Sequence, residues 1–117
     1  MEGVTLSAVS RGDALVVTIS GDLDIVTSPQ LDDCLTRAEG KHDRIILDLS
    51  AVDFLDTSAL AVIVGHWKQA QAAGRTLALA GARYRYTKTL WITGLADKLT
   101  LYDTLEQGLA ARPQAAG

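Results

Sequence analysis

Hydrophobic and polar positions change their spacing abruptly near residue 56 of this 117-residue chain. Just before this point, a near-continuous aliphatic run predicts a strand buried on both faces of a mostly parallel sheet. The run comprises Ile45, Ile46, Leu47 and Leu49. Just after it, apolar residues recur at the spacing of one helix face. They are Leu60, Ile63, Val64 and Trp67. We therefore expect a helix that begins near Thr57 and stops before Gly74, its C′ residue.

Three short polar residues, Asp56, Thr57 and Ser58, lie where the spacing changes. Asp56 is the expected N-cap, because its carboxylate can accept a hydrogen bond from a free backbone N–H of the first turn. Thr57 then occupies the first helical position, where capping does not need its hydroxyl. We expect this hydroxyl to point outward. From the residue types alone, a helix-start residue with no further task is an equally good interpretation.

The same alternation of patterns continues along the rest of the chain. The expected strands span residues 4–9, 14–20, 76–80 and 99–102, and the first two form a hairpin around residues 11–13. Three further helices are expected. One follows Thr27, one spans about residues 84–93 and is closed by Gly94, and one follows Asp103. Strands alternating with helices predict an α/β domain with a mixed, mostly parallel sheet of four to five strands and about four helices. The first pair of strands is expected to be antiparallel.

Two of these helices begin with the pattern of a capping box, in which side chains bond the free N–H groups of the first turn. The two sequences are Thr27-Ser28-Pro29-Gln30 and Asp103-Thr104-Leu105-Glu106. The buried stripe expected for the first helix comprises Leu31, Cys34, Leu35 and Ala38. Cys34 is the only cysteine, so we expect a small buried side chain with no chemical role.

Two motifs resemble those of a known family. The sequence DLSAVDFLDTSALAVIVGHWKQA, residues 48–70, resembles the signature of STAS domains, and specifically of the small stand-alone anti-sigma factor antagonists of bacteria. Gly21-Asp22-Leu23-Asp24, followed by Thr27, is similar to the second motif of that family. Together the motifs and the order of elements cover nearly the whole chain. The resemblance implies the STAS fold, with a single domain over residues 1–112 and a flexible tail over residues 113–117.

The resemblance also implies a function and a site. In anti-sigma factor antagonists, the anti-sigma factor is a serine kinase that phosphorylates the hydroxyl residue after the motif aspartate, and a metal-dependent serine/threonine phosphatase reverses the modification. Carried onto this chain, the acceptor is Thr57, with Ser58 as the fallback. The unphosphorylated protein would bind the anti-sigma factor and release a sigma factor. The expected partner-binding residues are Asp24, Asp56, Thr57, Ser58 and Ala59. The family usually has serine at the position of Thr57 and glycine at that of Ala59.

Composition narrows the classes of partner and location that are expected for this protein. The net charge of −3 and pI near 5.2 provide no strong positive field, so nucleic acid is not an expected partner. No apolar run is long enough to span a bilayer, and the first residues do not resemble a signal peptide. We expect a cytoplasmic protein without membrane insertion. Residues 83–88 interleave basic residues with tyrosines, which is more typical of a helix start or a protein interface.

Enzyme activity is not expected, because neither His42 nor His66 is placed by sequence beside Thr57 or Ser58. Such a lone histidine is most often a surface or half-buried residue. No His/Cys cluster or glycine-rich phosphate loop is present, so no metal or cofactor is expected. Trp67 and Trp91 are interpreted as core or half-buried residues. Two alternatives stay open: an accessory STAS subunit of a lipid transport or stress-signalling complex, and a STAS domain that binds a small ligand or nucleotide.

Overall fold

The computed structural model describes residues 3–82 and 99–111 of the chain. Its elements, in chain order, are β1 (Val4–Arg11), β2 (Ala14–Leu23), α1 (Ser28–Glu39), β3 (Arg44–Leu55), α2 (Thr57–Ala72), β4 (Thr76–Ala80), β5 (Thr100–Tyr102) and α4 (Leu105–Ala110). The helix expected over residues 84–93, the basic and aromatic stretch 83–88, Trp91 and the tail 113–117 lie outside the described residues.

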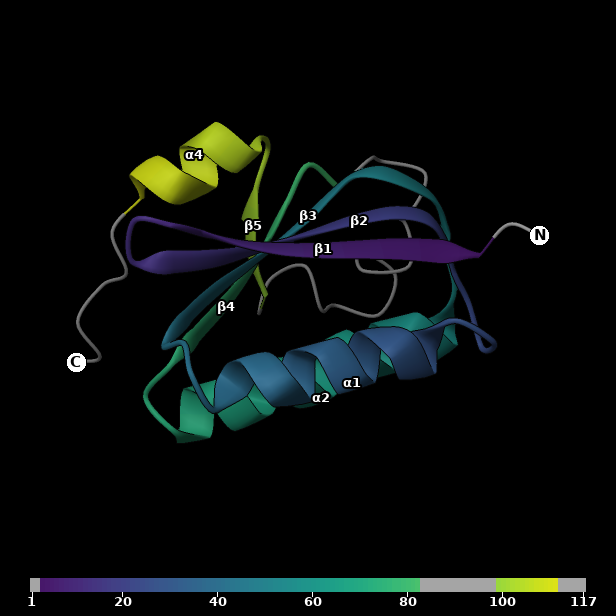
Figure 1. Cartoon of the computed structure of the whole chain (residues 1–117), viewed down its shortest axis with the longest axis horizontal. Coiled ribbons are helices and arrows are strands. Elements are labelled where there is room, and N and C mark those ends of the chain that lie inside the picture. The colour runs from purple at the N-terminus through teal and green to yellow at the C-terminus, as the bar shows by residue number, and fades with distance from the viewer. Residues whose placement is uncertain (1–2, 83–98, 112–117) are drawn as a thin grey trace.

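The strands form one five-stranded sheet with the order β1-β2-β3-β4-β5. β1 pairs with β2 in the antiparallel sense, and the three later pairs are parallel. Helices α1 and α2 lie side by side on one face of this sheet, and α4 lies on the other face (Figure 1). The expected mixed, mostly parallel α/β fold is therefore confirmed. The described part of the chain contains three of the roughly four expected helices.

Each face of the sheet has its own apolar core, because successive side chains of a strand point to opposite faces. On the side of α1 and α2, fully buried residues of β2 and β3 such as Val17, Ile19 and Leu47 pack against both helices. On the side of α4, a smaller core of Ala14, Ile46 and Ala80 packs against the final helix. The central strands are thus apolar on both faces, which is why they have near-continuous hydrophobic sequences.

Strands β2 and β3 are longer than the hydrophobic pattern predicts. The expected apolar segments end at Ser20 and Leu49, but the paired strands continue to Leu23 and Leu55. Their final residues do not follow a regular alternation of buried and exposed positions, and the ladder shifts register between Thr18 and Ser20 and again between Gly21 and Asp22. A bulge of this kind interrupts the simple period of two, so the strand ends are hidden from a pattern search.

This extension places two connections at one end of the sheet. Leu23 pairs with Leu55 in the parallel ladder, and each strand is followed by a helix after a short connection. We call residues 22–28, which lead from β2 into α1, the first junction. Residues 53–59, which lead from β3 into α2, are the second junction. The backbone N–H of Asp56 donates to the carbonyl of Leu23 at 3.0 Å, so the two junctions are bonded to each other.

The end of α2 agrees with the sequence prediction. Gly74 has a φ of 74°, a left-handed conformation that glycine adopts without steric cost. The N–H of Arg75 donates to the carbonyl of Ala70 at 2.8 Å, and that of Gly74 donates to Gln71 at 3.2 Å. These two bonds form a Schellman motif, which confirms Gly74 as the C′ residue.

The capping box of the last helix is displaced by one residue from its predicted place. Thr104, not Asp103, is the N-cap, and its hydroxyl accepts from the N–H of Gln107 at 3.1 Å. The Gln107 side chain in turn accepts from the N–H of Asp103 at 3.1 Å. The sequence fits both registers, because an acceptor side chain precedes Glu106 and Gln107 alike at the same spacing.

A buried histidine connects the two long helices. His66 on α2 is only 6% exposed, so the expectation of a surface or half-buried side chain is wrong. Its Nε2 lies 2.6 Å from a carboxylate oxygen of Asp32, and its Nδ1 is bonded to the carboxylate of Glu39. Both carboxylates belong to α1, and they supply the polar partners that a buried imidazole requires. This contact fixes α1 against α2.

Among the described residues, the other side chains predicted to be buried or half-buried have the expected burial, with the exception of Cys34. Trp67 packs half-buried against the core of the α1 and α2 face, as do Val64 and Cys34. Cys34 is therefore less buried than its place in the stripe suggests. Its partial burial nevertheless raises the pKa of the thiol, because desolvation disfavours the thiolate.

Candidate functional site

The second junction has the geometry that the sequence predicts. Asp56 has extended backbone angles, and its carboxylate accepts a hydrogen bond from the N–H of Ala59 at 3.1 Å. The carbonyl of Asp56 also accepts the first intrahelical bond, from Leu60 at 3.0 Å. Asp56 is therefore the N-cap of α2, as expected. A carboxylate in this position is further stabilised by the positive end of the helix dipole.

The three residues after Asp56 differ in their access to solvent. Thr57 is the first residue of α2 and is exposed, whereas Ser58 is half-buried. Ala59 is fully buried in the core beneath them. Its methyl group is therefore part of the core packing, and its link to the surface is the hydrogen bond that its N–H donates to the carboxylate of Asp56. Of the two candidate acceptors, Thr57 is the one that an approaching enzyme reaches more easily.

The first junction uses its polar side chains internally. The hydroxyl of Thr27 is buried, donates to the carbonyl of Asp22 at 2.6 Å and accepts from the N–H of Asp24 at 2.9 Å. Thr27 is the N-cap residue of α1, but its side chain caps no N–H of the helix. The capping box predicted from Thr27 to Gln30 is therefore wrong, because the hydroxyl is already committed to the preceding turn.

Asp24 lies in the first junction and faces its own backbone. One carboxylate oxygen accepts from the N–H of Val26 at 2.9 Å and from the N–H of Thr27 at 3.0 Å. These bonds, led by the one from Thr27, lower the pKa of Asp24 below its usual value, because they favour the ionised form. The sequence motif indicated that Asp24 matters but not that its carboxylate organises a turn. An aspartate two and three residues before the N–H groups it bonds is the signal of an Asx turn.

The acidic residues of the two junctions do not gather around a cation. Among residues 3–82 and 99–111, no group of three or more His, Cys, Asp or Glu side chains is arranged to hold a metal ion. Asp22 and Asp53 instead line a hollow beside the junctions, together with Val26 and Thr27. Asp24 and Asp56 each bond backbone N–H groups.

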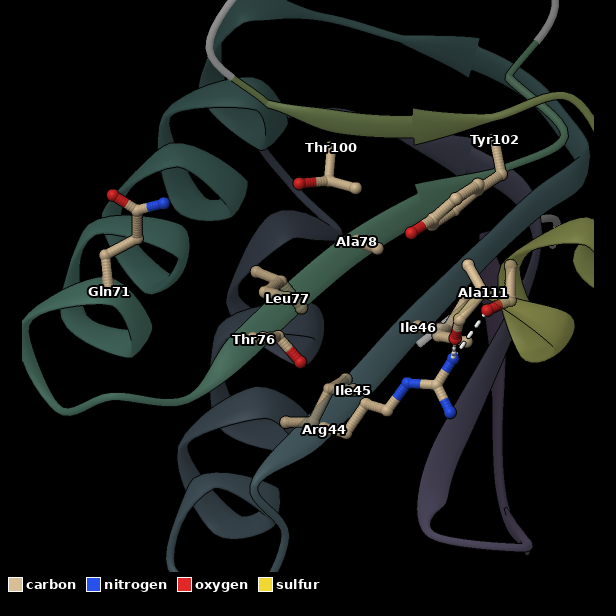
Figure 2. A pocket seen from close by; sticks show the side chains of 11 residues that line it. Arg44, Ile45, Ile46, Gln71, Thr76, Leu77, Ala78, Thr100, Tyr102 and Ala111 are labelled. Atoms are coloured by element: carbon tan, nitrogen blue, oxygen red, sulfur yellow. Dashed lines mark hydrogen bonds between the residues drawn. The ribbon is translucent and has the colours of Figure 1, made fainter. Parts of the chain in front are cut away.

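A second concave region lies on the α4 face. A cavity of about 490 Å³ is bounded by β3, β4, β5 and the end of α4. Arg44 lies at its margin, and its guanidinium donates to the carbonyls of Gly108 and Ala111, both at 2.6 Å, and to Asp13 at 2.8 Å. Figure 2 shows Thr100 and Tyr102 of β5 on one side of the cavity and Arg44 on the other. The hydrophobic pattern does not indicate this cavity, because its lining comes from five separate elements, with Gln71 of α2 beside residues of β3, β4, β5 and α4.

Comparisons with known proteins show which family this architecture matches. The STAS domain model matches residues 5–108. The chain is 29% identical to the anti-sigma-B factor antagonist of Staphylococcus epidermidis over 105 residues, which cover 88% of this chain and 96% of the relative. It is similar to the crystal structure of an anti-sigma factor antagonist from Mycobacterium paratuberculosis, with a TM-score of 0.83, 27% identity and 91% coverage of each chain. It also shares the fold of the phosphorylated form of the Bacillus protein SpoIIAA, with a TM-score of 0.70 and 21% identity over 91% of this chain and 96% of that one.

The fold is thus that of the solved anti-sigma factor antagonists, with two helices on one face of a mostly parallel sheet. The chain belongs to the STAS domain family. Within the described residues, none of the helices has the length and apolar character needed to cross a membrane.

Proposed function

We propose that this protein is an anti-sigma factor antagonist whose partner binding is switched by phosphorylation of Thr57. In the unphosphorylated form it binds an anti-sigma factor serine/threonine kinase and thereby releases a sigma factor. The kinase phosphorylates Thr57 and ends the interaction, and a metal-dependent serine/threonine phosphatase restores the binding form. The exposed hydroxyl of Thr57, directly after the N-cap Asp56 in a STAS domain, carries this proposal. The names of the relatives support it.

The position of Thr57 suits a phosphate without a change of fold. At a helix start, the N–H groups of the first residues have no carbonyl partner within the helix. Asp56 already accepts from Ala59, which leaves the N–H groups of Thr57 and Ser58 near the added phosphate. The dipole of the 16-residue helix α2 also favours an anion at this end. We therefore expect α2 to remain folded after phosphorylation.

The switch then acts at the surface. A phosphate adds about −1.5 to −2 charges beside Asp56. A partner shaped to the neutral hydroxyl of Thr57 must then desolvate this charge or face it in an unfavourable field. The partner-binding surface comprises Asp24, Asp56, Thr57 and Ser58, with Ala59 directly beneath it. Ser58 is the fallback acceptor, although its partial burial favours Thr57.

The test combines modification and binding. The full-length chain is incubated with candidate anti-sigma factor kinases and ATP, and mass spectrometry of the peptide over residues 56–68 locates the phosphate. Isothermal titration then compares unmodified protein, phosphorylated protein and Thr57→Glu against the same kinase. We expect the glutamate to weaken binding by about 1 to 3 kcal/mol and the phosphate to weaken it more. Equal affinity of the unmodified and phosphorylated proteins would rule out the switch.

The cavity beside Arg44 favours one alternative, a STAS domain that binds a small ligand or nucleotide. Its volume of about 490 Å³ falls within the range of about 300 to 1,000 Å³ that is usual for small-molecule sites. Titration with ATP and GTP tests this alternative directly. Saturable binding that Thr100→Trp abolishes would support it, because an indole at this position on β5 fills the cavity. Absence of binding would leave the antagonist function as the only one of the two supported.

A further inference from the structure

Apolar side chains are concentrated on the surface of the two junctions. Within the described residues, the large apolar side chains that are most exposed are Val9, Ile25, Val26 and Phe54. Ile25 is 72% exposed, Val26 is 77% exposed and Phe54 is 49% exposed, and all three belong to the junctions. Exposed apolar residues scattered singly need no explanation, but three at one end of a small domain indicate contact with another molecule. We call Ile25, Val26 and Phe54 the junction patch.

The members of the patch lie at the same end of the sheet as the switch site. Phe54 pairs with Asp22 across β2 and β3, so the two side chains share one face of the sheet. Val26 lines the same hollow as Asp22 and Asp53, the residue that precedes Phe54. Thr57 follows Phe54 by three residues, and both junctions leave the sheet at the same end (Figure 1). A partner that covers Thr57 therefore also approaches this patch.

Asp24 fixes the turn that exposes two of these side chains. Its carboxylate accepts from the N–H of Val26 and from the N–H of Thr27, and the N–H of Asp24 donates to the Thr27 hydroxyl. Ile25 and Val26 are thus exposed on a turn closed by three hydrogen bonds. A preformed turn loses little conformational entropy when it is bound, which increases the affinity obtained from each apolar contact.

The charge around the patch indicates the kind of partner. Four aspartates, Asp22, Asp24, Asp53 and Asp56, belong to the two junctions, while residues 20–36 and 45–65 contain no lysine, arginine or histidine. The surface is therefore apolar with an acidic rim. It complements a protein surface with an apolar hollow bordered by lysine or arginine, because interfaces match apolar centres and opposite charges.

We propose that Ile25, Val26 and Phe54 are the main apolar contacts of this protein with its anti-sigma factor, and that Asp24 is a positioning residue that holds the Ile25 and Val26 turn in the binding conformation. This inference rests on the proposed function and adds a division of roles to it. The patch supplies affinity, and Thr57 at its edge supplies control. A phosphate at Thr57 lies within the same interface, so its charge prevents the partner from closing over the apolar surface.

The first experiment measures the patch itself. Isothermal titration compares wild type with Ile25→Ser/Val26→Ser against the kinase that phosphorylates the chain in the assay above. Val9→Ser is the matched control, because Val9 is 55% exposed on β1 and lies outside the junctions. We expect the double variant to lose affinity by about tenfold or more, as truncation of central apolar contacts does, and the control to stay within about twofold. Equal affinities of the double variant and the control would overturn the inference.

The outcomes separate this inference from the function on which it rests. If phosphorylation still abolishes binding while the double variant binds like wild type, the patch assignment fails and the proposed function stands. If no anti-sigma factor kinase binds the wild-type chain, the proposed function fails and the patch has a different occupant. Sedimentation of the free chain tests the alternative of a second copy. Self-association that the double variant abolishes would assign the patch to a homodimer and overturn the proposal.

The second experiment tests the role of Asp24. Asp24→Asn keeps a side-chain oxygen that can accept from Val26 and Thr27, whereas Asp24→Ala removes it. We expect the alanine variant to lose about as much affinity as the patch variant and the asparagine variant to recover most of it. Adding Asp24→Ala to Ile25→Ser/Val26→Ser should have little further effect, because residues that act through one element are not additive. Equal losses for both single variants would show that Asp24 acts through its own charge and would overturn the positioning role.

Discussion

The two junctions use the same kinds of residue but place them differently relative to the helix that follows. In the first, the hydroxyl of Thr27 occupies the N-cap position and is buried, with its bonds directed to Asp22 and Asp24. In the second, Asp56 occupies the N-cap position, so Thr57 is one residue into the helix and is exposed. A shift of one position thus decides whether a threonine completes the fold or remains accessible to another protein. Under the proposed function, the difference separates a structural junction from a regulatory one.

This contrast explains why a modification can be tolerated at only one of them. A phosphate on Thr27 would have to enter a buried site and would remove the donor to the carbonyl of Asp22. Burial of that charge without a partner would cost far more than the few kcal/mol that stabilise a domain. A phosphate on Thr57 stays in solvent at the positive end of α2.

The largest expected effect is on phosphorylation. Thr57→Ala should abolish kinase-dependent phosphorylation, while Ser58→Ala should leave it in place. Stability should change little, because Thr57 is exposed and alanine is a better helix former. Mass spectrometry after incubation with kinase and ATP measures the first effect, and urea unfolding measures the second. Full phosphorylation of Thr57→Ala would move the acceptor to Ser58 and remove the functional side of the comparison.

The second-largest expected effect is a loss of stability when the buried hydroxyl of Thr27 is removed. Thr27→Val keeps the shape of the side chain but removes the hydroxyl that bonds Asp22 and the N–H of Asp24. Loss of these buried hydrogen bonds should lower the free energy of unfolding by about 1 to 3 kcal/mol. Thr57→Val is the matched control and should change it by less than about 0.5 kcal/mol, as exposed substitutions usually do. Urea denaturation followed by circular dichroism provides the measurement, and equal stabilities of the two variants would contradict the distinction.

A smaller effect is expected at the second helix start. Asp56→Ala removes the acceptor for the N–H of Ala59 and the negative charge at the start of α2. It should destabilise the protein by about 0.5 to 2 kcal/mol, the usual cost of losing an N-cap. Asp56→Ser is the control, because serine can accept the same bond and should recover most of the stability. If Asp56→Ala unfolds at the same urea concentration as wild type, the cap contributes less than the geometry indicates.

The hydrophobic pattern predicted the fold well because most of this fold is recorded in local periodicity. The change of spacing at Asp56 located the start of α2, and the isolated Gly74 located its end. The mixed, mostly parallel sheet and its antiparallel first pair followed from the alternation of elements. These features depend on residues that are near one another in sequence, so one chain contains enough information to find them.

Features that depend on contacts between distant segments were missed. Burial of His66 requires Asp32 and Glu39, which precede it by 34 and 27 residues. Spacing along the sequence alone cannot pair residues that far apart. The hydroxyl of Thr27 is used upstream, whereas its sequence suggested a helix cap. At the candidate site, the motif indicated Asp24, Asp56 and Thr57, but the burial of Ala59 appears only after α2 packs on the sheet.

The smallest expected effect is the pH dependence of the first junction. The hydrogen bonds from Thr27 and Val26 lower the pKa of Asp24 below its usual value of 3.8 in the folded protein. The unfolded state then binds more protons than the folded state. The contribution of the ionised Asp24 carboxylate to stability is therefore fully present above the unfolded pKa and is lost as the pH falls through the folded pKa. The other carboxylates of the chain titrate in the same range, so only a difference between two variants isolates Asp24.

Wild type should therefore be more stable than Asp24→Asn near neutral pH, and this difference should shrink as the pH falls below about 4. Urea unfolding of both proteins at a series of pH values measures the difference, with Asp53→Asn as a control for an exposed aspartate of the second junction. Solvent screening makes the expected difference modest, since Asp24 is itself partly exposed. A difference that stays constant with pH would mean that the ionised carboxylate does not hold the turn, and the turn would then depend on Thr27 alone.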